Sequence, residues 1–184
     1  MINSYEIIVT SSTVLTSGID FPLDTVVSIV MVGAGGCGEH SVMSGLGGSA
    51  GELVEFDLGP FSTKYDIEIT IGTGAINRAG ADSYSAGTQT IVDGVVAAPG
   101  TTSYSSPSSK WYKGKVFKDG IGFESTTDDN SPICYAYGGE CSVFSDGGNA
   151  NPSGSSIGGF GAGGGFVSNG VSIGGNGKVI LSWS

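Results

Sequence analysis

Residues 30–38 read VMVGAGGCG, an apolar run that passes directly into closely spaced glycines. Gly33, Gly35 and Gly38 have the spacing G-x-G-x-x-G, which in dinucleotide-binding enzymes joins a strand to the N-terminus of a helix. The strand is present here, but glycine recurs through residues 45–51, where each glycine in a helix would cost about 1 kcal/mol relative to alanine. Without that helix the pyrophosphate loses the dipole that binds it. We therefore interpret the stretch as a strand that ends in a glycine-rich segment.

The composition points to a folded chain with an unusual amount of glycine. Glycine accounts for 34 of the 184 residues, well above the usual ~7%, and there is no third-residue repeat of the collagen kind. The 39% of hydrophobic residues is enough to build a core. A formal net charge of −10 disfavours nucleic acid and anionic membranes as partners. Only 13% of the residues are charged, so the surface is rich in Ser, Thr, Asn and Gly, which suits contact with sugars or another protein.

Strand-like runs recur along the chain, and glycine or β-branched residues interrupt nearly every window of helical length. Residues 65–71, YDIEITI, alternate so that Tyr65, Ile67, Ile69 and Ile71 are expected to face inward. Asp93-Gly94 predicts a tight turn between two short strands. Further strands are predicted at 5–9, 25–32, 52–58, 88–92, 95–98 and 178–183. The pattern predicts an all-β fold, an antiparallel sandwich or barrel-like domain with essentially no helix.

The glycine runs need an explanation of their own. Residues 158–165, GGFGAGGG, and 174–177, GGNG, repeat the character of residues 33–38. Such runs can lie as extended segments of the polyproline II type, packed backbone to backbone. The alternative is a flexible linker. We expect ordered structure in which residues 38–47 and 158–170 act as display loops.

The middle of the chain differs from its two ends. Residues 101–146 are poorer in glycine, contain eight of the seventeen aromatic residues and hold four of the seven basic residues within 110–118. We interpret them as an insertion or lobe between two glycine-rich parts, residues 1–100 and 147–184. Cys134 and Cys141 flank YAYGGE, a possible hairpin, and are either bridged or free thiols.

The order of the motifs resembles that of a known family. An apolar strand with GAGG, a GGxAGE segment, the run YxIxITIGTGA, GGFGAGGG and a terminal G-K-V-I-L-S-W follow one another at residues 21–38, 45–74 and 158–183. This arrangement is similar to the glycine-rich domain at the C-terminal ends of bacteriophage tail-fibre and related receptor-binding proteins, including fibre-tip adhesins with polyglycine motifs. The resemblance covers about half of the chain, and residues 101–146 have no clear counterpart in it.

The resemblance implies a virion protein, assembled in the host cytoplasm, that attaches the phage to its host. It implies a homotrimer, a non-catalytic role and a receptor that is a polysaccharide or an outer-membrane protein. The chain begins without a long shaft, so it is expected to attach to other virion proteins. Two alternatives stay open: a structural virion component, such as a capsid spike, decoration or tail assembly protein, and a polysaccharide-degrading tip enzyme.

The candidate receptor-binding residues are aromatic or basic side chains, which anchor many interfaces. They are Lys110, Trp111, Tyr112, Lys113, Phe160 and Phe166. The aromatic residues of the middle segment could equally form the core of that lobe, and the two phenylalanines could cover bare glycine backbone. No catalytic set, metal site or cofactor site is predicted: the single histidine, His40, lies in a glycine-rich segment, and the acids Asp119, Glu124, Asp128 and Asp129 show no motif spacing. No signal peptide or membrane insertion is expected.

Overall fold

The structure, a computed structural model, describes residues 4–38, 47–78, 85–100, 155–165, 167 and 170–184, together with the backbone of four strands between 110 and 136. These residues form strands and extended segments and contain no helix, so the predicted all-β fold is confirmed. In the same residues, no helix meets the length and hydropathy that a membrane span requires.

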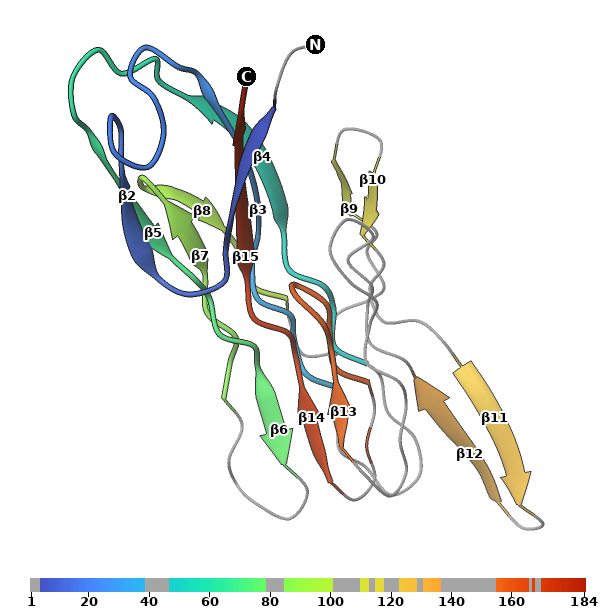
Figure 1. Ribbon diagram of the computed structural model, residues 1–184. Coiled ribbons are helices and arrows are strands. Elements are labelled where there is room, and N and C mark those ends of the chain that lie inside the picture. Colours follow the sequence, from blue (N-terminus) through green and yellow to red (C-terminus); the bar gives the residue numbers. More distant parts are fainter. Residues whose placement is uncertain are drawn as a thin grey trace.

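Two four-stranded antiparallel sheets pack face to face as a sandwich (Figure 1). The first has the order β1-β15-β3-β4 and the second the order β2-β5-β7-β8. The strands of the first sheet are β1 (Tyr5–Val9), β3 (Val27–Val32), β4 (Leu53–Leu58) and β15 (Lys178–Trp183). Those of the second are β2 (Thr13–Thr16), β5 (Asp66–Thr70), β7 (Thr90–Val92) and β8 (Val95–Ala97). The last strand of the chain, β15, therefore lies in the first sheet between β1 and β3.

The core of the sandwich follows from the alternation of the strands. Ile67 and Ile69 of β5 are buried against residues of the opposite sheet, among them Ile29 of β3 and Leu181 of β15. Tyr65 was expected to face inward as well, but it precedes β5 and is 40% exposed. Its ring stacks on Phe61, with 4.5 Å between centroids. Its hydroxyl donates to the Asp93 carboxylate at 3.0 Å, a polar contact that keeps the residue at the surface.

The predicted tight turn joins β7 to β8. Asp93 and Gly94 both have positive φ, 48° and 79°, as a two-residue hairpin turn of type I′ requires. The hairpin pairs Val92 with Val95 and so fixes the register of the second sheet. The turn chemistry of the sequence thus determines the geometry at this edge.

Beyond the sandwich the chain continues into a smaller sheet. It has the order β13-β14-β6, with β6 (Ile76–Arg78), β13 (Ser156–Ile157) and β14 (Val171–Ile173). Figure 1 shows both chain termini at one end of the sandwich and these three strands at the other end. The remaining strands form two antiparallel hairpins, β9 (Lys110–Tyr112) with β10 (Lys115–Phe117), and β11 (Phe123–Asp128) with β12 (Ser131–Ala136). Cys134 thus pairs with Ser125 across the second hairpin, while Cys141 lies outside the described residues.

Between the sandwich and the small sheet lies what we call the glycine layer, formed by residues 33–38, 47–52, 72–75, 98–100, 158–165 and 174–177. Its segments pack main chain against main chain. A Cβ atom on Gly35 would come closer than 3.0 Å to the Ala162 carbonyl, and a Cβ atom on Gly174 would meet the Gly35 carbonyl in the same way. Glycine is therefore required here because neighbouring backbones occupy the space of a side chain.

Residues 33–38 form the centre of the glycine layer, and all six are buried. A β-strand bonds to at most two neighbours, but this segment bonds to five others through hydrogen bonds of 2.7–3.0 Å. The partners are Ser49 and Glu52, Ala75, Gly100, Gly164 and Gly175. An extended helix with three residues per turn points successive peptide groups about 120° apart, which permits such bonding on all sides. The predicted backbone-to-backbone packing is confirmed.

This burial corrects one expectation from the sequence. Residues 39–46 of the predicted display loop 38–47 lie outside the described residues, so that prediction stays open. Residues 158–170 were expected to act as the second display loop. Instead, residues 161–165 are buried, as are residues 33–38. Of the described residues in 158–165, Phe160 is the one classed as exposed. Main-chain hydrogen bonds hold these runs inside because no side chain separates them.

Candidate binding surface on the glycine layer

Two buried serines form hydrogen bonds to the glycine layer where it adjoins the small sheet. The Ser172 hydroxyl accepts the Gly38 N–H at 2.7 Å and donates to the Gly165 carbonyl at 2.8 Å. The Ser156 hydroxyl accepts the Gly165 N–H at 2.7 Å. Gly38 and Gly165 belong to different segments of the glycine layer. The two serine hydroxyls therefore connect these segments to the strands β13 and β14 of the small sheet.

Removing one of these hydroxyls should be costly. In Ser172→Ala, the buried Gly38 N–H and Gly165 carbonyl both lose a partner, and we expect the free energy of unfolding to fall by about 2–3 kcal/mol. Urea denaturation followed by circular dichroism measures this fall. Ser28→Ala is the control, since the Ser28 hydroxyl bonds to Asp57 at an exposed site, and it should cost less than about 1 kcal/mol. Equal losses in the two variants would contradict the proposed role of Ser172.

An internal repeat shapes the surface next to these serines. Residues 156–161 read SIGGFG and residues 172–177 read SIGGNG. The two copies lie side by side in parallel, with Ser156 opposite Ser172 and Ile157 opposite Ile173. The serines point inward and are buried, whereas Ile157 is 64% exposed. Equivalent residues of the two copies thus form rows across the layer.

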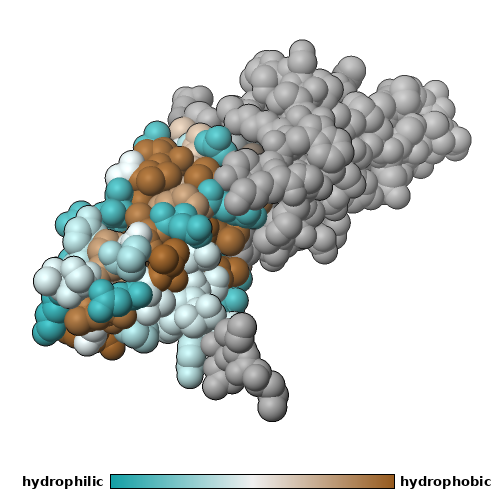
Figure 2. All heavy atoms as spheres, turned by 90° about the horizontal axis from the view of Figure 1, so that it is seen from above, coloured by the Kyte–Doolittle hydropathy of each residue, from teal (hydrophilic) through white to brown (hydrophobic). Residues whose placement is uncertain are grey.

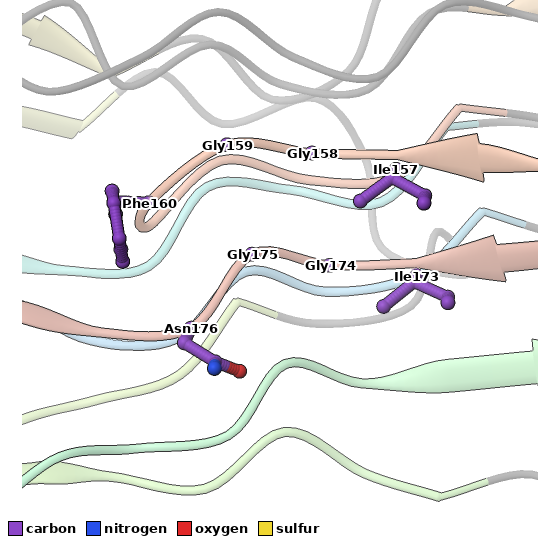
Figure 3. A pocket seen from close by; sticks show the side chains of 8 residues that line it. All are labelled: Ile157, Gly158, Gly159, Phe160, Ile173, Gly174, Gly175 and Asn176. Carbon is purple, nitrogen blue, oxygen red and sulfur yellow. The ribbon is translucent and has the colours of Figure 1, made fainter. Parts of the chain in front are cut away.

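A trough runs between two of these rows (Figure 3). Ile157 and Ile173 form one wall, and Phe160 and Asn176 form the other. The floor consists of the paired glycines Gly158, Gly159, Gly174 and Gly175. The trough has a volume of about 480 Å³. It is a concave surface with one aliphatic wall, one wall formed by an aromatic and an amide side chain, and a floor without side chains.

Phe160 and Asn176 supply the chemistry of the second wall. Phe160 is 37% exposed, and the Lys178 ammonium lies 5.3 Å from the centroid of its ring. In Figure 3 the ring is seen edge-on, with one face turned along the chain toward Ile157. The Asn176 Oδ1 accepts the Gly74 N–H at 3.0 Å, which holds the side chain in place. An aromatic face and an oriented amide therefore stand side by side.

The structure brings only part of the predicted binding set to this surface. Phe160 lies in it and is partly exposed, and its role in receptor binding stays a prediction. Lys110, Trp111 and Tyr112 form β9, whose backbone pairs with β10, and their role stays a prediction. Lys113 and Phe166 lie outside the described residues. The described parts of the chain therefore provide Phe160 as the one predicted residue with a defined side-chain environment.

Asn176, Ile157 and the two serines were not predicted as functional residues. The signal was present in the sequence as the repeat SIGGxG, whose two copies are offset by sixteen positions (156 to 172). A search for internal repeats would have paired Phe160 with Asn176. The sequence patterns used for strands do not detect it because glycine runs have no hydrophobic period.

The described residues contain no group of three or more His, Cys, Asp or Glu side chains that could hold a metal ion. His40, Asp119 and Asp129 lie outside them, and nothing is described of the side chains of Glu124 and Asp128 in β11. Cys37 is fully buried in the glycine layer, and burial raises its pKa from 9.0 to about 11, against the opposing effect of a main-chain hydrogen bond. The thiol is therefore neutral at pH 7 and unsuited to nucleophilic chemistry.

The Cys37 thiol makes stability depend on pH in the alkaline range. In the unfolded chain it ionises near pH 9.0 and in the folded chain near pH 11, so its contribution is complete below pH 9 and is lost as the pH rises through 11. We expect this contribution to be about 2–3 kcal/mol. Urea midpoints at pH 8 and pH 10.5 should differ more for the native chain than for Cys37→Ala, which lacks the group. The same loss in both proteins would show that other groups cause it.

Comparison of the chain with protein-family models and with curated protein sequences finds no match.

Proposed function

We propose that the chain is a virion receptor-binding protein, a tail-fibre tip or spike adhesin that attaches a phage to the host surface without catalysis. The order of its glycine-rich motifs, which resembles that of fibre-tip proteins, supports this role. The observation that carries the proposal is the location of the glycine layer and the small sheet on the side of the sandwich away from both termini (Figure 1). There main-chain hydrogen bonds hold the segments of the glycine layer together, and the trough lies on this layer.

The opposite end is suited to attachment within the virion. Figure 2 looks onto the end that carries the termini, where apolar side chains lie among hydrophilic ones. Exposed apolar residues of this end are Tyr5, Ile19, Leu23, Val26 and Tyr65. Exposed apolar surface on a folded protein commonly marks a protein–protein contact. We propose that this end joins another virion protein, with the chain assembled as a homotrimer.

The same apolar end also favours a second candidate, a structural virion component whose surfaces all serve assembly. The two roles differ in what the glycine-layer end contacts. A receptor-binding protein leaves this end free in the virion and binds cells with it. A structural component binds other virion proteins and leaves cells unbound.

Two assays side by side separate these roles. Labelled protein should bind saturably to intact cells of the strain in which the virus grows, and unlabelled protein should compete with virus adsorption. Co-sedimentation with purified virion parts tests assembly. Co-sedimentation without cell binding would favour the structural role. Release of reducing sugar from host polysaccharide would contradict both roles and show that the protein is a polysaccharide-degrading enzyme.

A further inference from the structure

We propose that the trough between the rows Ile157/Ile173 and Phe160/Asn176 binds a neutral glycan. This inference rests on the proposed function and names the class of receptor and the site that contacts it. It commits to a carbohydrate of uncharged pyranose units as the occupant, and three features of the trough favour that occupant.

The first feature is the size of the trough. Its walls are three residues apart along each segment, from Ile157 to Phe160 and from Ile173 to Asn176. An extended chain rises about 3.1–3.3 Å per residue, so the walls stand about 9–10 Å apart. Adjacent segments are about 4.8 Å apart. The floor between the walls consists of glycine, so a pyranose ring can approach the backbone where any side chain would block it.

The second feature is the chemistry of the wall. A pyranose ring has apolar C–H faces and polar hydroxyl edges. The exposed ring of Phe160 offers a flat apolar face, and Ile157 offers aliphatic contact on the other side. The Asn176 Oδ1 is engaged by the Gly74 N–H, and among the described residues its Nδ2 hydrogens have no hydrogen-bond partner. They can donate to a sugar hydroxyl.

The third feature is the direction of the trough. It crosses the two parallel segments instead of running along an edge strand, because equivalent residues of the repeat form each wall. A peptide strand adds to a sheet by pairing along its edge, and that geometry is not available to a chain that lies across the segments. A glycan needs no such pairing.

Charge distinguishes neutral from anionic glycans. The chain has a net charge of −10, so a polyanionic polysaccharide would be repelled over a distance of the Debye length. The Lys178 ammonium lies over the Phe160 ring, and the two stabilise each other. A neutral glycan meets neither repulsion nor competition for this contact.

The experiment titrates the protein with neutral hexasaccharides of glucose, galactose, mannose and N-acetylglucosamine, with an oligogalacturonate as the anionic comparison, and follows the ¹⁵N-labelled protein by NMR. Binding should shift signals of Phe160, Asn176 and the floor glycines. Phe160→Leu keeps an apolar side chain but removes the flat face, and affinity should fall about tenfold. Asn176→Asp keeps the acceptor for Gly74 and removes the donors, and it should weaken binding as well.

Matched controls separate loss of contact from loss of fold. Ile157→Ala should weaken glycan binding, whereas Ile8→Ala, at another exposed isoleucine (54% against 64%) in β1 of the sandwich, should not. Urea midpoints of all variants show whether the fold persists. If Phe160→Leu is less stable than the native chain, the effect of Ile157→Ala on glycan affinity decides whether the trough is the binding site.

The outcomes for the trough and for the proposed function are distinguishable. Saturable cell binding that Phe160→Leu and Ile157→Ala both weaken, and that periodate treatment of the cells abolishes, supports the trough site. Saturable cell binding that these variants leave unchanged, or that protease treatment of the cells abolishes, overturns the trough site and leaves the proposed function standing. Glycan binding at the trough without cell binding supports the site and contradicts the proposed function. If the protein bound the oligogalacturonate more tightly than the neutral hexasaccharides, the proposed specificity for neutral glycans would be contradicted.

Discussion

Replacing Gly35 with alanine should lower the free energy of unfolding by about 4 kcal/mol, one of the two largest effects that we expect from a single substitution. Gly35 lies at the centre of the glycine layer, where its N–H donates to the Gly175 carbonyl and its own carbonyl accepts the Ala75 N–H. The added methyl group would meet main-chain atoms of Ala162 and Gly163. A backbone has no alternative rotamer with which to give way, so whole segments must move apart.

Gly87→Ala is the matched control for this substitution. Gly87 lies beside the same layer with no positive φ, and its nearest neighbours, the Gly35 carbonyl oxygen and the Pro99 Cβ, would be 3.3 Å from the new methyl group. We expect a change within about 1 kcal/mol, since a shift of a few tenths of an ångström relieves the contact. Urea midpoints measure both variants. Equal midpoints would show that main-chain packing around Gly35 is looser than described.

The second large effect concerns the core of the sandwich. Leu181→Ala should lower the free energy of unfolding by about 3–4 kcal/mol, because the truncation leaves a cavity in a close-packed interior. Leu181 is fully buried in β15, where its partners are Ile7 of β1 and Ile29 of β3. The strand holds the centre of the first sheet, so both neighbouring strands lose contact.

Ile180→Ala tests the same strand on its other face. Ile180 precedes Leu181 and is only partly buried, so its truncation should cost about 1 kcal/mol. Thermal or urea denaturation of the pair measures the difference. If Ile180→Ala were the more damaging variant, the assignment of inner and outer faces of β15 would be wrong.

The sandwich was predictable because its strands have side-chain patterns. The alternation at Ile67 and Ile69 identified the inner face of β5, and Asp93-Gly94 identified the β7–β8 turn. Tyr65 was the exception, since an aromatic residue at a strand start can stack and bond at the surface as easily as it can be buried. Alternation of apolar and polar residues predicts which side chains of a strand are buried, but it does not predict the burial of residues that precede the strand.

The glycine layer was predictable in kind but not in arrangement. Backbone-to-backbone packing followed from the number of glycines, but a glycine run has no side chain to say which face is buried. The burial of residues 33–38 and their hydrogen bonds to five other segments were therefore not predicted. The neighbours of this segment come from the middle and the end of the chain, and only three-dimensional structure places them.

One of the two residues in the second wall of the trough could be predicted from the sequence. Phe160 was selected as an exposed anchor because a lone aromatic residue among glycines must either be displayed or cover the backbone, and it lies partly exposed beside Lys178. Asn176 was not selected, because an asparagine in a glycine run is typical of a turn. Asn176 lies beside Phe160 because the two repeats pair in parallel register. The sequence indicates this pairing only when the two SIGGxG copies are aligned with each other.

Host attachment through the glycine-layer end is tested most directly by cell binding of labelled native protein beside Phe160→Leu and Ile8→Ala. The measurement is saturable binding to intact host cells, with unlabelled protein as competitor and virus adsorption as a second readout. We predict that the native chain and Ile8→Ala bind and block adsorption, and that Phe160→Leu binds about tenfold more weakly. No saturable binding of the native chain, with virus adsorption unchanged by excess protein, would contradict the proposed function.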